Sequence, residues 1–224
     1  MLVEIPVNGT TTKGYLAIPE TGTGPGVIVM QEWWGLVDHI KEVCDRLAEA
    51  GFTALAPDMY HGHATTDPDE AGRLMMALDV PQVAVDLAGT IAYLLNHDAC
   101  GSARVGLMGF CLGGQLALYG ACENPAATGA CVDFYGVHPS IKPDVAKLEC
   151  PVLGFFAEKD GFVTPEVAAN LAQRLTDAGK VHEFKTYAGV DHAFFNDTRH
   201  DVFDKAAADD AWSRTIEFLR AHVA

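Results

Sequence analysis

Basic residues and long hydrophobic runs are both scarce in this sequence. The 224-residue chain has 15 Lys and Arg against 30 Asp and Glu, which gives a formal net charge of -15 at pH 7. An acidic surface repels phosphate backbones and anionic lipid headgroups, so nucleic acids and membranes are poor candidates as partners. No apolar run approaches the roughly 18–20 residues that a membrane-spanning helix needs, and the chain does not open with a secretory signal pattern. We therefore expect a cytoplasmic protein.

The spacings that mark metal sites and disulfide frameworks are also missing. There is no Cys-x-x-Cys pair, and no third ligand stands at a convincing distance from His61 and His63. We therefore predict no metal site and no cofactor. Reduced thiols are the expectation for a chain with a large core and no export signal. Five cysteines are interpreted as small buried residues, namely Cys44, Cys100, Cys122, Cys131 and Cys150. The sixth, Cys111, stands in a different context.

Glycine and proline are too few for a disordered or collagen-like chain. The sequence has 22 Gly and 11 Pro, and 49% of its residues are hydrophobic. A chain of this length buries roughly 70% of its unfolded surface, which is enough for one substantial core. No repeat, linker or charge block divides the sequence. We therefore predict a single domain over residues 1–224, as a monomer or a small homo-oligomer.

Short apolar runs alternate with longer helical patterns along the chain. The predicted strands cover residues 26–30, 52–56, 104–108, 130–135, 152–157 and 183–187. The predicted helices cover residues 39–50, 83–95, 115–122, 165–178 and 205–223, with a further helical pattern that ends near residue 75. Residues 3–7 and 15–18 are typical of an antiparallel hairpin. Strands separated by helices favour an α/β fold with a mostly parallel sheet and helices on both faces. Loops that carry ligands then follow the strands along one edge.

The most informative turn contains Cys111. An apolar strand leads into Gly109-Phe110-Cys111-Leu112-Gly113, and a helical pattern follows. This layout is a nucleophile elbow with Cys in the place of Ser. Glycines are needed there because a strained strand-to-helix turn packs tightly, and the helix N-terminus favours a thiolate and an oxyanion. Without that context, a glycine-rich turn with an incidental buried cysteine would explain the string equally well.

A base and an acid are expected later in the chain, in the order nucleophile, acid, histidine. Asp160 lies just past the predicted strand 152–157, where Glu158 is a close competitor. We favour Asp160 because it lies deeper in the turn, although an Asp before Gly is often only a turn former. His192 follows the last predicted strand and is interpreted as the general base. The predicted chemistry is attack by a Cys111 thiolate on an ester carbonyl.

These residues resemble the dienelactone hydrolase (carboxymethylenebutenolidase) family of the α/β-hydrolase fold. The resemblance covers nearly the whole chain and rests on five segments, Gln31–Leu36, Pro57–Tyr60, Gly109–Gly114, Glu158–Val163 and Gly189–Phe194. It implies a single-domain α/β-hydrolase fold and a triad of Cys111, His192 and Asp160.

The resemblance also assigns roles around the nucleophile. It implies that Glu32 interacts with the thiol and helps to generate the thiolate when substrate binds. From the sequence alone, a Glu at a strand end is more often a structural hydrogen-bonding residue. The resemblance further implies an oxyanion hole formed by the backbone N–H groups of Trp33 and Leu112. Further residues are predicted to line the substrate pocket, namely Trp34, Tyr60, His61, Tyr135, His138 and Phe194.

One departure from the family concerns the binding of a substrate carboxylate. Dienelactone hydrolases hold that carboxylate with two arginines, and the corresponding positions here hold Gly62 and Asn196. Four other residues are candidates for the missing positive charge, namely His61, His63, Arg73 and Arg199. The chemistry therefore transfers from the family more readily than the substrate specificity.

Three functional hypotheses follow from the sequence. The first is a thiol-dependent hydrolase of small esters or lactones, with a small-molecule substrate. The second is acyl transfer or thioester hydrolysis through the same acyl-enzyme. The third is a binding protein that keeps the fold without catalysis, which the loss of the nucleophile, acid or histidine would favour. Cys111, Asp160 and His192 are all in place, so we predict the hydrolase.

Overall fold

A central eight-stranded sheet organises the chain, of which the computed structural model describes residues 1–223. The strand order is β1-β2-β4-β3-β5-β6-β7-β8, parallel from β4 to β8 and antiparallel at β1 and β2. The strands are β1 (Leu2–Val7), β2 (Thr10–Ala17), β3 (Gly26–Met30), β4 (Thr53–Pro57), β5 (Val105–Phe110), β6 (Thr128–Phe134), β7 (Val152–Ala157) and β8 (His182–Tyr187). Every residue of β3 to β7 is buried, as expected for parallel strands covered on both faces.

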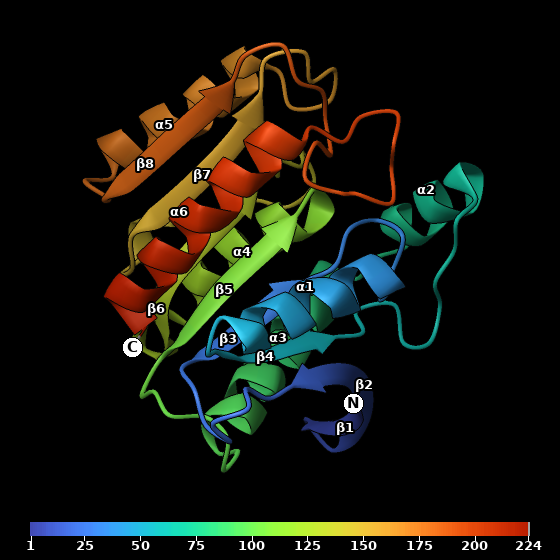
Figure 1. Cartoon of the computed structure of the whole chain (residues 1–224), viewed down its shortest axis with the longest axis vertical. Helices are drawn as coiled ribbons and strands as arrows, with labels where there is room; N and C mark the ends of the chain where they lie inside the picture. The colour runs from blue at the N-terminus through green and yellow to red at the C-terminus, as the bar shows by residue number, and fades with distance from the viewer. Residues whose placement is uncertain (224) are drawn as a thin grey trace.

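Helices cover both faces of this sheet (Figure 1). They are α1 (Asp38–Glu49), α2 (Pro68–Met76), α3 (Val80–Leu95), α4 (Leu112–Glu123), α5 (Pro165–Asp177) and α6 (Lys205–Val223), with short 3₁₀ turns at Pro125–Ala127 and Val145–Lys147. Apolar residues of α1 and α6 form one buried cluster with the sheet, and those of α3, α4 and α5 form another. The predicted α/β fold is confirmed, and the carboxyl ends of the parallel strands meet along one edge.

Several element boundaries differ from the sequence-based prediction, among them those of β2 and of the junction between β5 and α4. The strand β2 begins at Thr10, because Asn8 and Gly9 form a two-residue hairpin turn with φ angles of 40° and 81°. Asn-Gly turns of this kind join strands directly, and the polar residues that follow belong to β2, which lies between β1 and β4 in the sheet. The strand β5 extends to Phe110 and α4 begins at Leu112. A single residue, Cys111, therefore connects a strand to a helix.

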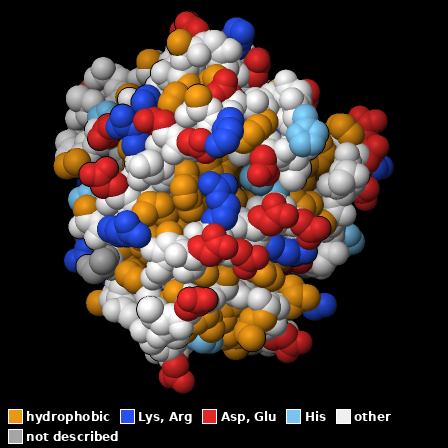
Figure 2. All heavy atoms as spheres, in the orientation of Figure 1, with side chains coloured by type: hydrophobic (Ala, Val, Ile, Leu, Met, Phe, Trp, Pro, Cys, Tyr) orange, Lys and Arg blue, Asp and Glu red, His pale blue; other side chains and the backbone are white. Residues whose placement is uncertain are grey.

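On the face shown in Figure 2, charged and hydrophobic side chains are interspersed, and Lys and Arg side chains stand singly among acidic and hydrophobic ones. Within residues 1–223, no single helix is long and apolar enough to cross a membrane. The helices α2 and α3, bent at 88° to each other, meet the length and composition criteria only as a pair.

The first turn of α4 packs directly against the ends of β3 and β5. A Cβ added at Gly113 would meet the carbonyl oxygens of Met30 and Gln31, and one added at Gly109 would meet the carbonyl of Gly113. These are backbone atoms, which cannot move aside as the tip of a flexible side chain can. Glycine at both positions therefore allows the close approach that places Cys111 at the sheet edge.

We expect Gly113→Ala to lower the free energy of unfolding by roughly 1–3 kcal/mol, the range for overpacking a tight site. Gly72→Ala is the matched control, because Gly72 also lies in a helix but nothing lies within 4 Å of an added Cβ. That change should raise stability by about 0.5–1 kcal/mol, since alanine loses less backbone entropy than glycine. Urea denaturation measures both. Equal effects of the two substitutions would contradict the packing account.

Candidate active site

Cys111 occupies a strained turn between β5 and α4. Its backbone has φ 54° and ψ -121°, in a region that residues with a side chain rarely adopt. Two backbone hydrogen bonds hold this conformation. The N–H of Cys111 donates to the carbonyl of Phe134 at 2.9 Å, and its own carbonyl accepts from the N–H of Gly114 at 3.0 Å. The turn directs the side chain toward a cleft that the residue helps to line.

His192 and Asp160 lie on the loops that follow β8 and β7. The Nδ1 atom of His192 is 2.6 Å from Oδ2 of Asp160. The other carboxylate oxygen, Oδ1, accepts hydrogen bonds from the backbone N–H groups of Phe162 and Val163 at 2.7 and 2.8 Å. Glu158, the competing acid, instead accepts from the N–H of Gly189. The structure therefore brings Asp160 rather than Glu158 to the histidine.

The surroundings of His192 change its affinity for a proton. Burial by itself lowers the pKa of the imidazole. Hydrogen bonds with Asp160 and Cys111, together with the negative charges of both partners, outweigh burial and raise the pKa to about 10. A histidine hydrogen-bonded to a thiolate and a carboxylate favours the imidazolium form. The surroundings thus favour a protonated His192 beside Cys111.

Glu32 follows β3 and is buried, with 1% of its surface exposed. Its Oε2 atom accepts a hydrogen bond of 2.9 Å from Nδ2 of Asn196. The amide oxygen of Asn196 is in turn fixed by the backbone N–H and the hydroxyl of Thr198, at 3.1 and 2.6 Å. Asn196 thus holds Glu32, a role that we did not predict. The one signal in the sequence was that Asn stands where the family has a carboxylate-binding arginine.

Two backbone N–H groups are available near the nucleophile. Leu112 is the first residue of α4, and the N–H groups of a first helical turn have no partner within the helix. Trp33 lies in the loop after β3, and in the described part of the chain its N–H donates to no backbone carbonyl. Both residues line the same cleft as Cys111. These are the two donors predicted for an oxyanion hole.

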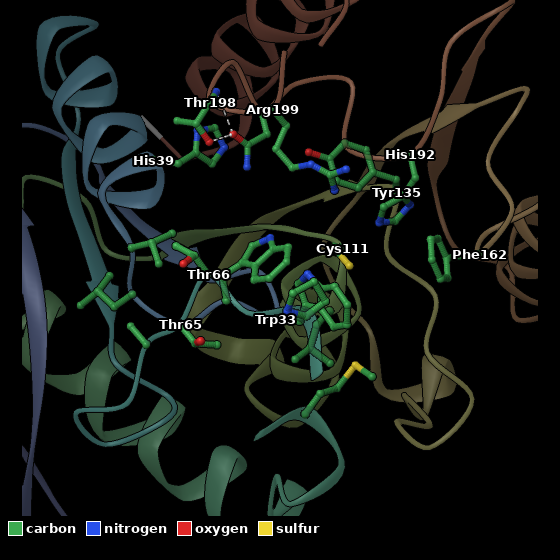
Figure 3. A pocket seen from close by; sticks show the side chains of 18 of the residues that line it. Trp33, His39, Thr65, Thr66, Cys111, Tyr135, Phe162, His192, Thr198 and Arg199 are labelled. Carbon is green, nitrogen blue, oxygen red and sulfur yellow. Dashed lines mark hydrogen bonds between the residues drawn. The ribbon is translucent and has the colours of Figure 1, made fainter. Parts of the chain in front are cut away.

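The cleft beside Cys111 has a volume of about 1140 Å³ (Figure 3). Its walls are largely apolar and include Trp33, Trp34, Leu36, Met75, Val137 and Phe162. The two tryptophan rings lie 4.7 Å apart at an interplanar angle of 60°. Figure 3 shows Cys111 between Trp33 on one side and His192 with Phe162 on the other. A hydrophobic cleft with a few polar groups is the usual form of a small-molecule site.

Tyr135 and His138 also line this cleft, as predicted. Tyr135 has a φ of 44° and its ring meets that of His192 edge-on at 4.9 Å. Its buried hydroxyl has no hydrogen-bond partner among the described residues. Burial, followed by the negative charge of Glu32, holds the pKa of Tyr135 well above its ordinary value, so the hydroxyl keeps its proton. Burial lowers the pKa of His138, which favours its neutral form.

Three predicted pocket residues lie elsewhere. Tyr60 and His61 line a separate pocket of about 250 Å³, where Nε2 of His61 lies 3.1 Å from Oδ2 of Asp86. The positive φ angles of His61 and Gly62, 51° and 99°, turn the chain at this point. Phe194 is fully buried and packs against the rings of Tyr135 and Tyr187. The prediction of these three as lining residues is therefore wrong.

The structure adds lining residues that the sequence analysis did not select. Met75 comes from α2, and Phe162 from the turn after Asp160. Phe162 is 79% exposed, and an aromatic residue in a loop at a catalytic strand end was the available signal. Of the four candidate cations, Arg199 lines the cleft. Among residues 1–223, no group of three His, Cys, Asp or Glu side chains is arranged to hold a metal ion.

Comparison with known proteins gives a consistent result. The model of the dienelactone hydrolase family matches residues 12–223. "Protein usf" of Aquifex pyrophilus is 39% identical over 228 residues, covering 99% of this chain and 98% of its own. The "Putative carboxymethylenebutenolidase" of Aquifex aeolicus is 35% identical, with the same coverage. The crystal structure of a "Putative Dienelactone Hydrolase" from Klebsiella pneumoniae superposes with a TM-score of 0.89 at 29% identity, covering 99% of both chains.

We expect Asp160→Asn to lower the pKa of His192 from its value of about 10, because a neutral amide no longer stabilises the imidazolium. Cys111→Ser should lower it as well, since the thiolate is the second source of the shift. NMR titration of the imidazole measures both changes. Glu158→Gln is the control, because Glu158 contacts the backbone of Gly189. A His192 pKa that survives both active-site substitutions would contradict the account of the shift.

Proposed function

Since the chain belongs to the dienelactone hydrolase family and is therefore a carboxylic ester hydrolase, we propose that it cleaves small esters or lactones through an acyl-enzyme on Cys111. One observation carries this proposal. His192 Nδ1 lies 2.6 Å from Oδ2 of Asp160, and His192 and Cys111 line the same cleft, so that nucleophile, base and acid candidates come together. Nucleophile, base and orienting acid in this order are what covalent acyl transfer requires.

In the first half-reaction the thiolate of Cys111 attacks the ester carbonyl carbon and forms a C–S bond. The carbonyl electron pair moves onto oxygen, where the N–H groups of Trp33 and Leu112 stabilise the negative charge. When the electron pair returns, the C–O bond to the alcohol breaks. His192 donates its proton to the departing alkoxide, which leaves as an alcohol, or as the freed hydroxyl of an opened lactone. Asp160 keeps the imidazole oriented through Nδ1.

In the second half-reaction neutral His192 removes a proton from a water molecule. The resulting hydroxide attacks the thioester carbonyl, and the same two backbone N–H groups stabilise the second oxyanion. Collapse of this intermediate breaks the C–S bond and releases the carboxylic acid. The protonated histidine is thereby restored, and the proton that Glu32 took from the thiol returns to the Cys111 thiolate.

Glu32 acts on the thiol in this proposal. The carboxylate is buried at the end of β3, near the elbow, and Asn196 fixes one of its oxygens. It accepts the thiol proton as the substrate binds, which supplies the nucleophile at the moment when it is needed. Asn196 acts as a positioning residue here, because its amide fixes the carboxylate of Glu32.

Cys111→Ala is expected to abolish hydrolysis of an activated aryl ester, because no other group on the cleft floor replaces the nucleophile. Loss of one triad member typically costs about 10⁴-fold or more in rate. Release of 4-nitrophenol from 4-nitrophenyl acetate provides the measurement, with thermal unfolding as a check of the fold. Cys100→Ala is the control, since Cys100 is also partly exposed but lies at the opposite end of β5. Full activity in Cys111→Ala would overturn the triad.

We expect Glu32→Gln to shift the acid limb of the kcat/KM profile to higher pH, because an acceptor for the thiol proton is lost. Asn196→Ala keeps the carboxylate but removes its hydrogen-bond donor, so a smaller shift in the same direction is expected. The pH–rate profile on 4-nitrophenyl acetate measures both. If Glu32 had a purely structural role, Glu32→Gln would lower activity equally at every pH. That result would contradict the proposal that Glu32 accepts the thiol proton.

A further inference from the structure

The positive charges along the cleft already have acidic neighbours. Lys41 and Arg199 are the lysine and arginine that line it. The Nζ atom of Lys41 lies 2.8 Å from a carboxylate oxygen of Asp38, and Nη2 of Arg199 lies 2.9 Å from one of Asp201. A carboxylate on the substrate would therefore compete with these partners for either cation.

The reacting end of the cleft disfavours a second negative charge. Glu32 accepts its hydrogen bond from the neutral amide of Asn196. The amide fixes the carboxylate without compensating its charge. In a buried, low-dielectric setting, two like charges repel more strongly than they do in water. An anionic group near Glu32 and the thiolate of Cys111 is thus unfavourable.

The space is larger and more apolar than a small lactone requires. Its volume of about 1140 Å³ exceeds the roughly 300–1000 Å³ that is typical for sites of drug-sized ligands. Trp33, Trp34 and Phe162 supply aromatic walls, and Met75 extends the apolar surface to α2. Removing an apolar group from water against such walls favours binding in proportion to the buried area.

A neutral donor remains to orient the substrate. The hydroxyl of Tyr135 is buried without a partner in the described chain, and it keeps its proton. A buried donor without a partner is unfavourable until an acceptor arrives. An acceptor oxygen of a substrate would satisfy it, and Figure 3 shows Tyr135 beside His192 at the cleft.

We propose that the preferred substrates are uncharged esters or lactones with a bulky apolar or aromatic group, which lies against Trp33 and Trp34, and that the cleft discriminates against substrates with a carboxylate. The inference rests on the proposed function and concerns which molecules enter the same site. The proposed preference differs from that of an enzyme that binds a substrate carboxylate with arginines.

Three 4-nitrophenyl esters test the proposal, namely the 4-methylbenzoate, the 4-carboxybenzoate and the acetate. The first two have similar size and differ in charge, and a para carboxylate cannot reach the ester to assist its hydrolysis. We expect kcat/KM for the methylbenzoate to exceed that for the carboxybenzoate by about tenfold or more. Discrimination of this size corresponds to modest differences in binding to a pocket. Equal values, or a preference for the charged ester, would overturn the proposal.

Two variants test which residues cause the preference for the neutral ester. Trp34→Ala should lower the ratio of methylbenzoate to acetate activity by about tenfold, as expected for the loss of a pocket wall. Arg199→Gln should leave the preference for the neutral ester in place. If wild type instead prefers the carboxybenzoate and Arg199→Gln removes that preference, Arg199 binds a substrate carboxylate and the proposal is wrong.

The same assay separates this inference from the proposed function. Cys111-dependent hydrolysis of the acetate, combined with a preference for the charged benzoate, would overturn the substrate class and leave the mechanism in place. Hydrolysis of the esters by Cys111→Ala at the wild-type rate would overturn the mechanism itself, and the substrate class with it.

Discussion

The hydrogen bond between Asp160 and His192 connects the parts of the site to the sheet. One oxygen of Asp160 is held by two backbone N–H groups of its own turn, so the other oxygen points in a fixed direction. The loop after β8 is thereby joined to the loop after β7, and the imidazole is directed to the elbow after β5. Because β5, β6, β7 and β8 are parallel neighbours, these loops emerge along one edge. The topology therefore assembles a site from residues that are far apart in the chain.

The strained backbone of Cys111 depends on the same sheet edge. A residue in this region of φ and ψ costs on the order of 1–3 kcal/mol, and such a cost persists only where the surroundings enforce the conformation. Here the enforcement comes from β6, whose last residue Phe134 accepts the Cys111 N–H, and from the glycines that let α4 approach β3. Beneath the turn, Phe110 lies in a cluster of aromatic rings with Phe134 and Phe195. The elbow is thus an extension of the core.

Local patterns predicted the fold and selected the three residues that we propose as the triad, whereas features that depend on long-range contacts were missed. Apolar runs identified the buried strands, and strand-to-helix context selected Cys111, while loop position selected His192 and Asp160. The link from Asn196 to Glu32 spans 164 residues, and no local pattern contains it. His61 was predicted to line the substrate pocket, whereas its actual position depends on a positive-φ turn and on Asp86 in α3. Whether a side chain lines the pocket depends on the geometry of the loops, which the periodicity of apolar residues in the sequence does not encode.

The proposed catalytic groups and the walls of the cleft come from different parts of this molecule. Cys111, Asp160 and His192 follow the ends of β5, β7 and β8. Several walls of the cleft come from α2 and from loops, through residues such as Met75, Trp34 and Phe162. Asn196 belongs to both parts, because it donates a hydrogen bond to Glu32 and also lines the cleft. A charged residue at this position would change the electrostatics of the cleft while Cys111, Asp160 and His192 stay where the sheet holds them.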